Sequence, residues 1–224
     1  IGALYDPLDG HLDPSGTTHA YAKAARMGGA TIETHCKVLE TNPRADGTWD
    51  VVTEKGTIHA EHVVNAGGLW AREVGAMAGV YLPLHPMEHQ YIVTEPDPAL
   101  VAWRKAGNAE HPVLRDADAK WYVREERGGW ILGPYEQGAP ARFLYDVPES
   151  FRADLFPLDL DRIEEEYMSM IHRIPSSETV GLKDDYNGPI CYTPDGIPLV
   201  GPAPGLRNMW LAEGFSFGIT AAGG

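Results

Sequence analysis

The sequence has little positive charge and little cysteine. Its 18 Lys and Arg stand against 32 Asp and Glu, which gives a formal net charge of −14. This acidic balance argues against a nucleic acid or an anionic membrane surface as a partner. The two cysteines, Cys36 and Cys191, form neither a CxxC pair nor a zinc-ligand spacing, and are typical of free thiols in a reducing compartment. We expect a cytoplasmic protein, or one of the mitochondrial matrix if the source is eukaryotic.

Long hydrophobic runs are also missing. No apolar run approaches the roughly 18 residues of a membrane span. The chain has no signal peptide and no initiating Met, and it stops inside what reads as the start of a helix, so we expect an internal fragment. What is present, 43% hydrophobic residues with 25 Gly and 18 Pro, predicts a loop-rich α/β or α+β fold in one or two domains.

The first part of the chain predicts one helix and a small β-meander. Asp13 can cap a helix that has Pro14 at its first position and ends at Gly28-Gly29. Short β-like runs follow, punctuated by the turn signals Asp46-Gly47 and Lys55-Gly56. These runs cover residues 31–34, 37–40, 49–53 and 57–61.

The rest of the chain predicts a strand, glycine turn and helix, and then a different texture. Residues 62–66 read as a strand that meets Gly67-Gly68 and a helix over 69–78. From Pro83 on, strands at 90–94, 120–124 and 130–132 alternate with long polar loops, and apolar spacing predicts a helix over 160–174. Strands return at 189–192 and 208–212. We therefore expect three segments, 1–82, 83–187 and 188–224.

The sequence His85-Pro86-Met87-Glu88-His89 matches the H-x-x-E-H of inverted zinc peptidases. That site needs both histidines on one face of a helix. Pro83 and Pro86 interrupt the approach, and residues 90–94 alternate like a strand, which would scatter the ligands. We therefore favour a loop that enters a strand, and no metal site.

The segment Gly214-Phe215-Ser216-Phe217-Gly218 matches the G-x-S-x-G of a nucleophile elbow, between a predicted strand and a helix start. An elbow serine still needs an acid and a histidine after it, and few residues follow Ser216. The alternative is a cofactor site, because a glycine turn after a strand presents backbone N–H groups to anionic oxygens. Small residues there also let a flat ring approach the backbone.

Six ordered segments together carry a resemblance to one known family. They are Tyr5 to Pro14, Val63 to Ala71, His89 to Thr94, Gly133 to Glu136, Tyr192 to Gly196 and Gly214 to Gly224. With them, the sequence is similar to the dimethylglycine and sarcosine dehydrogenase family of D-amino-acid-oxidase-like flavoproteins, and residues 46–51 and 70–75 resemble its dimethylglycine branch most. The resemblance covers essentially the whole chain.

The resemblance implies a fold and a cofactor. It implies an α/β, FAD-binding domain, present in part, and an α+β substrate domain built on an antiparallel sheet. The dinucleotide motif G-x-G-x-x-G, its acidic ribose partner and the histidine that carries covalent flavin have no match here. The folate-binding half of the longer members is also absent, so folate concerns only a full-length protein.

The resemblance also implies site residues. His89 and Tyr122 match positions that face the flavin, and they are the candidate catalytic residues for an N-methylated glycine as the small-molecule substrate. We expect cofactor contacts from the turn at Ala66, Gly67 and Gly68. Further expected contacts are Val38, Trp70, Phe215, Ser216, Phe217, Gly218, Ile219 and Thr220.

Three functions stay open at this point. The resemblance favours a flavin amine dehydrogenase or oxidase that demethylates dimethylglycine or sarcosine by hydride transfer to FAD. A second possibility is a regulatory relative that keeps the fold as an interaction module without catalysis. The third is the serine hydrolase that Ser216 suggests.

Overall fold

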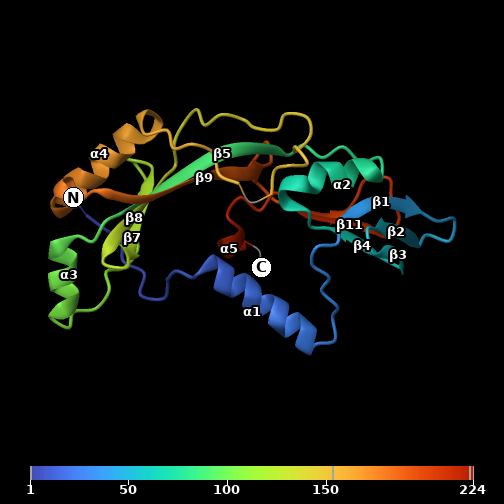
Figure 1. The fold of residues 1–224 in the computed structure, drawn as a ribbon, viewed down its shortest axis with the longest axis horizontal. Coiled ribbons are helices and arrows are strands. Elements are labelled where there is room, and N and C mark those ends of the chain that lie inside the picture. The colour runs from blue at the N-terminus through green and yellow to red at the C-terminus, as the bar shows by residue number, and fades with distance from the viewer. Residues whose placement is uncertain (1, 153, 222, 224) are drawn as a thin grey trace. The chain divides into compact units, whose positions relative to one another are not determined.

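The computed structural model describes residues 2–152, 154–221 and 223. The chain divides into two compact units (Figure 1). The first unit comprises residues 1–11, 88–140 and 152–189, and the second comprises residues 12–87, 141–151 and 190–224. Each unit has a hydrophobic core of its own. Together they form a mixed α/β chain that contains antiparallel sheets.

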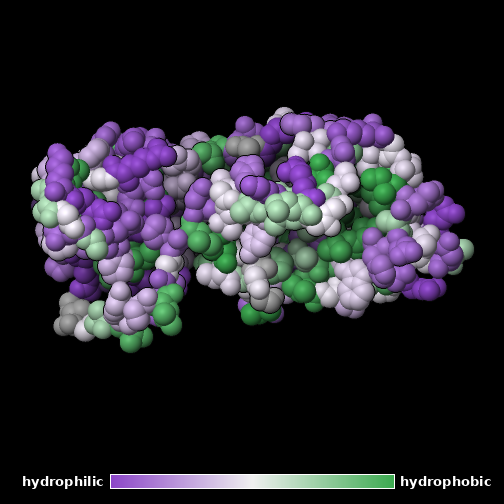
Figure 2. Space-filling model, turned by 90° about the horizontal axis from the view of Figure 1, so that it is seen from below, coloured by the Kyte–Doolittle hydropathy of each residue, from purple (hydrophilic) through white to green (hydrophobic). Residues whose placement is uncertain are grey.

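The second unit begins with helix α1 (Pro14–Met27), as the sequence predicts. The Asp13 side chain accepts a hydrogen bond from the Gly16 N–H, and the helix ends at Gly28. None of the described residues of α1 is buried. The large side chains of Tyr21 and Met27 on α1 are exposed, and Figure 2 shows that hydrophobic side chains lie beside hydrophilic ones on the surface that it views. Helix α1 therefore contributes little to the core of this unit.

Strands β1 (Val38–Pro43), β2 (Trp49–Thr53) and β3 (Gly56–Ala60) form a three-stranded antiparallel sheet. The predicted meander is confirmed. The additional strand predicted over residues 31–34 is wrong, because these residues are exposed and lie outside the strands. The Lys55 ammonium binds the Glu33 carboxylate and the Thr34 carbonyl at 2.9 and 3.0 Å, so side-chain contacts hold this segment in place of a strand partner.

A second three-stranded sheet, in the order β10-β11-β4, holds the predicted strand–turn–helix unit. Strand β11 (Met209–Glu213) runs antiparallel to β10 (Leu199–Pro202) and parallel to β4 (Val63–Asn65). The chain turns after β4 into η1 (Gly68–Trp70) and α2 (Ala71–Met77). After β11 it turns into the short helix α5 (Gly218–Ala221). Both predicted transitions are confirmed.

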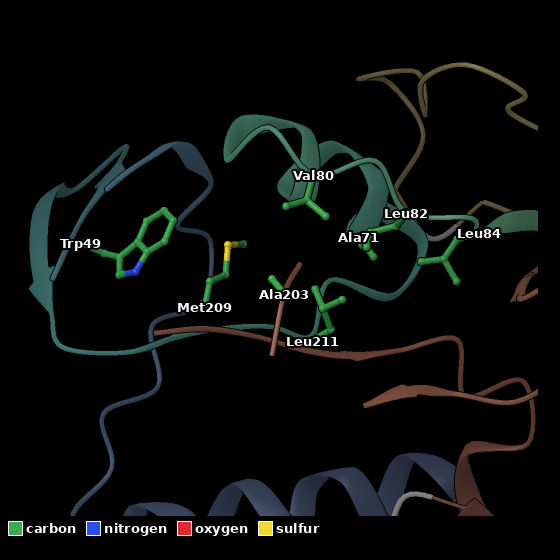
Figure 3. Close-up of a cluster of buried hydrophobic side chains, with 8 residues drawn as sticks. All are labelled: Trp49, Ala71, Val80, Leu82, Leu84, Ala203, Met209 and Leu211. Carbon is green, nitrogen blue, oxygen red and sulfur yellow. The ribbon is translucent and has the colours of Figure 1, made fainter. Parts of the chain in front are cut away.

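The core of the second unit lies between α2 and these strands (Figure 3). Trp49 from β2 is 1% exposed, and its indole N–H donates to the Arg207 carbonyl at 3.0 Å. Met209 and Leu211 from β11 face the same cluster. Its remaining members are Ala71, Val80, Leu82, Leu84 and Ala203.

The first unit is built on a five-stranded sheet in the order β6-β7-β8-β5-β9. The strands β6, β7 and β8 pair antiparallel along the chain, and β8 pairs antiparallel with β5. Figure 1 shows β5 and β9 as its longest strands. The strand bounds are β5 (His85–Thr94), β6 (Leu114–Asp116), β7 (Trp121–Glu126), β8 (Gly129–Pro134) and β9 (Leu182–Tyr192).

Helix α4 (Glu164–Arg173) packs on β7 and β8, after the short helix η2 (Asp161–Ile163) and before η3 (Pro175–Thr179). The helix predicted over 160–174 is confirmed. Ile163 and Met170, both fully buried, meet Trp121 and Leu132 of the sheet. The structure adds helix α3 (Pro98–Lys105), where we expected a polar loop: the Asp97 side chain accepts from the Ala99 N–H and starts it. Across the described residues, no helix is long and apolar enough to cross a bilayer.

Candidate active site

One face of the five-stranded sheet packs against α4, and the other carries a set of aromatic and cationic side chains. Along β7, Trp121 and Val123 are buried in the core beneath α4, while Tyr122 between them is half-buried. Side chains alternate along a strand, so Tyr122 lies on the opposite face. Along β5, Gln90 and Ile92 are fully buried and His89 is half-buried. We call the face of His89 and Tyr122 the tyrosine face.

The tyrosine face brings the two candidate catalytic residues to a common neighbour. Tyr135, the residue after β8, has its ring centroid 6.4 Å from that of His89 and 5.7 Å from that of Tyr122. A second aromatic pair, Tyr91 and Tyr186, stacks at 4.6 Å. His89 and Tyr122 are more than 30 positions apart in the sequence, and the strand order places them on one surface.

Two arginines that the sequence analysis did not single out also belong to this face. Arg115 on β6 pairs in register with Tyr122, donates to the Tyr135 hydroxyl, and has its guanidinium carbon 5.1 Å from the Tyr135 ring centroid. Arg124 on β7 binds the Glu126 carboxylate at 2.7 Å. The sequence does signal Arg124, because it is two residues after Tyr122 on one strand and side chains two apart share a face. Arg115 can be placed on that face only once the pairing of β6 with β7 is known.

Burial sets the protonation states of both candidate residues. It lowers the pKa of His89, and the nearby Glu136 carboxylate opposes that shift. It raises the pKa of Tyr122, and the neighbouring Tyr135 adds to the effect while Arg124 and Arg115 oppose it. At neutral pH the imidazole is therefore largely a proton acceptor, and the phenol is a hydrogen-bond donor.

In the second unit, the two glycine turns lie next to each other at one edge of a sheet. Because β4 and β11 are parallel, their carboxyl ends meet at the same edge. The turn at Gly67 and Gly68 follows β4, and the segment 214–218 follows β11. The Glu213 carboxylate joins them, since it accepts from the Gly67 and Gly68 N–H groups at 2.8 and 3.1 Å.

Glu213 is nearly inaccessible to solvent, at 1% exposed. Burial raises its pKa to about 7, although the two hydrogen bonds from the Gly67 and Gly68 amides favour the charged form. Asn65 completes the turn: its side-chain oxygen accepts from Gly67 N–H at 3.1 Å and its amide donates to the Ala71 carbonyl at 2.9 Å. An internal carboxylate thus occupies the two amides that the sequence suggested for a ligand.

The closing segment 214–220 is short and rich in small residues. The Ser216 hydroxyl lies 3.5 Å from the Gly214 carbonyl. At Gly218, an added Cβ would meet no atom within 4 Å, and the same holds at Gly68. Phe215 is half-buried, whereas Phe217, Ile219 and Thr220 are exposed. Of the other expected cofactor contacts, Ala66 and Trp70 are exposed beside the glycine turn, and Val38 starts β1 in the other sheet of the unit.

The whole H-x-x-E-H sequence lies on strand β5, so the loop that we expected there is wrong and only the strand over residues 90–94 is confirmed. The strand accommodates Pro86 because that residue is close to its first residue, His85. Glu88 faces the helix side and binds Arg162, whereas His89 belongs to the tyrosine face. The strand thus directs these two side chains to opposite sides of the sheet. Among the residues that the structure describes, no group of three or more His, Cys, Asp or Glu is arranged to hold a metal ion.

Comparisons with known proteins agree with this architecture. The family model for FAD dependent oxidoreductases (DAO) matches residues 1–224. The chain is 43% identical to the mitochondrial dimethylglycine dehydrogenase of Mus musculus and 39% identical to the mitochondrial sarcosine dehydrogenase of the same species, over the whole chain in both cases. It spans 26% and 24% of the lengths of these relatives. The L-proline dehydrogenase of P. horikoshii superposes with a TM-score of 0.71 at 27% identity, over 91% of this chain and 50% of that one.

Proposed function

Because the chain belongs to the DAO family of FAD-dependent oxidoreductases, we propose that it is part of an enzyme that demethylates an N-methylated glycine, dimethylglycine or sarcosine. The full-chain similarity to dimethylglycine and sarcosine dehydrogenases supports this substrate class. The chain spans about a quarter of those relatives, so the proposed activity concerns a longer protein. In this proposal the first unit binds the substrate and the second unit contributes to the cofactor site.

The second unit fits part of an FAD site. Ligands of α/β sheets bind beyond the carboxyl ends of the strands, and both glycine turns lie there. The space beside Gly68 and Gly218 contains no protein atom where a Cβ would point, which leaves room for a close approach of a flat or anionic group. The Gly67 and Gly68 amides already donate to Glu213, so they do not support the fit through hydrogen bonds to the cofactor. What supports the fit at this turn is the open space beside Gly68, where a cofactor could come into van der Waals contact with the backbone. Bound FAD would supply the acceptor for two electrons.

The tyrosine face carries the proposal, because it gathers a proton acceptor, phenol donors and a cation around Tyr135. His89 accepts the proton of the substrate ammonium, which its lowered pKa and half-buried position allow, and so delivers the neutral amine that oxidation requires. Tyr122 stays protonated and donates a hydrogen bond to the substrate carboxylate. Arg115 adds a positive charge beside Tyr135.

The reaction balances with these roles. Bound FAD would accept a hydride from the methyl carbon, which would leave the amine as an iminium cation. Water then adds to the iminium carbon, and the adduct breaks down to formaldehyde and the demethylated amine. The proton held by His89 and the proton released by water leave to solvent, while Tyr122 holds the substrate in place without changing its own protonation.

The test uses the full-length protein. Dimethylglycine and sarcosine should each be mixed anaerobically with the purified protein while its flavin absorbance is followed, and formaldehyde should be measured after addition of an artificial electron acceptor. We expect bleaching and formaldehyde with at least one of the two methylated glycines, and neither with glycine. A protein that carries FAD yet responds to neither substrate, or one without FAD, would contradict the proposal and favour the regulatory alternative.

A further inference from the structure

A buried ionic network lies on the helix side of the five-stranded sheet. The Arg162 guanidinium, from η2, binds the Glu136 carboxylate at 2.6 Å and the Glu88 carboxylate at 2.9 Å. The Glu88 and Glu136 side chains are 2% and 1% exposed, and that of Arg162 is 13% exposed. Two buried carboxylates thus share one arginine. Burial lowers the pKa of Arg162, but the hydrogen bonds to Glu136 and Glu88 outweigh this effect and keep the guanidinium charged.

The same network holds both sequence neighbours of His89. Glu88 binds Arg162 and also accepts from the Asn187 side-chain amide at 2.9 Å. Gln90 donates to the Glu136 carboxylate at 2.8 Å and to the Asp159 carbonyl at 3.0 Å, and its oxygen accepts from the Asp159 N–H at 3.0 Å. Both amide hydrogens and one lone pair of the Gln90 side-chain oxygen are thereby bound to fixed partners.

The network also reaches the second member of the aromatic cluster. Glu136 directly follows Tyr135, whose ring is a neighbour of both His89 and Tyr122. One guanidinium on the helix side therefore joins the two backbone segments that present His89 and Tyr135 on the tyrosine face. These segments are β5 and the turn after β8, which are 46 residues apart in sequence at the Gln90–Glu136 hydrogen bond.

We propose that Arg162 is a positioning residue, which acts through the sheet by bridging Glu88 and Glu136 and thereby fixes the spacing of His89 and Tyr135 on the opposite face. The expected effect on catalysis rests on the proposed function. The bridge from Arg162 to Glu88 and Glu136, and its effect on the position of His89, do not depend on it. Arg162 has no contact with the aromatic cluster among the described hydrogen bonds and ion pairs, so its effect passes through the backbone and the charge of Glu136.

Arg162 also controls the charge next to His89. Glu136 is the charged group that raises the pKa of His89 against the effect of burial. Arg162 neutralises part of that negative charge, so its removal should move the pKa of His89 upward. The other charged and titratable groups on the elements around His89 remain in place. They include Arg115 on β6, Tyr122, Arg124 and Glu126 on β7, Tyr135 after β8, Tyr91 on β5 and Tyr186 on β9.

The experiment compares three variants of the full-length protein: Arg162→Met, Arg162→Lys and the double variant Arg162→Met with Glu136→Gln. Arg173→Met is the matched control, because Arg173 is on α4 of the same unit and its ion pair with Asp116, at 3.1 Å, lies away from the network. Two quantities are measured against pH. One is kcat/KM for the methylated glycine, and the other is the rate at which diethyl pyrocarbonate acylates His89, followed by peptide mass spectrometry.

We expect Arg162→Met to lower kcat about 10- to 100-fold, because small displacements of reacting groups have effects of that size. The midpoints of both pH profiles should move to higher pH. Arg162→Lys keeps one charge and should hold the midpoints near those of the wild type with a smaller loss of kcat. The double variant should return the midpoints of both pH profiles to values near those of the wild type without restoring kcat. Arg173→Met should behave as wild type.

Three results would overturn the inference. In the first, Arg162→Met changes the melting temperature and flavin content but leaves kcat and both midpoints at wild-type values. In the second, the Arg173→Met control shifts the midpoints as much as Arg162→Met does. The third concerns Glu136→Gln alone, which is the test if Arg162→Met does not fold. This variant should move the midpoint of the acylation profile to lower pH, and an unchanged midpoint would overturn the inference. A wild type without turnover rejects the proposed function, while the acylation profile still tests the role of Arg162.

Discussion

The ring of Tyr122 lies across the backbone of Gly133. The two residues pair in register between β7 and β8, and a Cβ on Gly133 would lie 2.0 Å from the ring carbon Cζ of Tyr122. Gly133 is therefore the residue that allows the tyrosine to lie flat on the sheet, with its ring directed toward Tyr135. Glycine inside a strand often marks such a close approach.

Gly133→Ala should displace the Tyr122 ring and so act as an indirect Tyr122 variant. In the full-length protein we expect both Gly133→Ala and Tyr122→Phe to lower kcat/KM for the methylated glycine, by about 10-fold or more. Gly188→Ala on β9 is the matched control, since its Cβ would make an ordinary contact of 3.6 Å with Leu155. Normal turnover by Gly133→Ala would mean that the place of the ring does not matter.

His89→Gln should lower kcat/KM about 100-fold or more, because it removes the proton acceptor. The pKa of His89 is lowered by burial, so wild-type activity should fall as the pH drops through that value and the imidazole becomes protonated. This acidic limb should change in the variant. His172→Gln, an exposed histidine on α4, should leave rate and pH profile unchanged. If His89→Gln loses activity at low pH with the same profile as the wild type, a group other than His89 causes that loss.

Ser216 and Gly218 separate the flavin and hydrolase interpretations of the closing segment. Ser216→Ala should keep most amine dehydrogenase activity, and a fluorophosphonate probe should not label wild-type Ser216. Gly218→Val should lower FAD content, since the space that its side chain enters holds no protein atom and the fold should tolerate the change. Labelling of Ser216, together with normal FAD content in Gly218→Val, would overturn the assignment.

Glu213→Gln should change the pH dependence of stability. The pKa of Glu213 is raised to about 7 in the folded protein, above its usual value of 4.5. The folded state therefore retains a proton that the unfolded chain loses, and wild-type stability should decrease as the pH rises from about 4.5 to about 7, by about 3 kcal/mol in all. The variant lacks this decrease.

The measurement is the melting temperature of the full-length wild type and of Glu213→Gln between pH 5 and pH 8. We expect the wild type to lose stability relative to the variant as the pH rises. Glu61→Gln, which alters an exposed carboxylate before β4, serves as the control and should track the wild type. A difference between wild type and Glu213→Gln that stays constant with pH would contradict the prediction.

Local signals predicted most of the elements. The Asp13-Pro14 start of α1, the Asp46-Gly47 turn of the meander and the apolar spacing of α4 each depend on neighbours within a few residues. Residues 31–34 show the limit of this approach, because β-like composition does not supply a partner strand. Helix α3 was missed although its start signal, Asp97 before Pro98, is present in the sequence. There, prolines and polar residues were interpreted as a loop.

The site was predictable only in part. His89 and Tyr122 came from a resemblance. The sequence predicted a strand only over residues 90–94, and it is the observed extent of β5 that places Glu88 and Gln90 on the side opposite His89. The bridge from Arg162 to Glu88 and Glu136, and the bond of Glu213 to the glycine turn, join residues that are far apart in the chain. No local pattern encodes such pairs. The expected segment boundaries at 82 and 187, and the cofactor contacts, remain predictions.

The parallel pairing of β4 with β11 has a consequence for the order of folding. Val63 meets Met209 only after the intervening residues, which include the core strands and helix of the first unit, have left the ribosome. Such a non-local contact forms slowly, because a long loop must close first. During synthesis, strand β4 should therefore lack its partner β11 while the residues of the first unit that lie between them in the sequence are already available to fold. A nascent chain halted before Met209 should be the species most prone to aggregation and most dependent on chaperones.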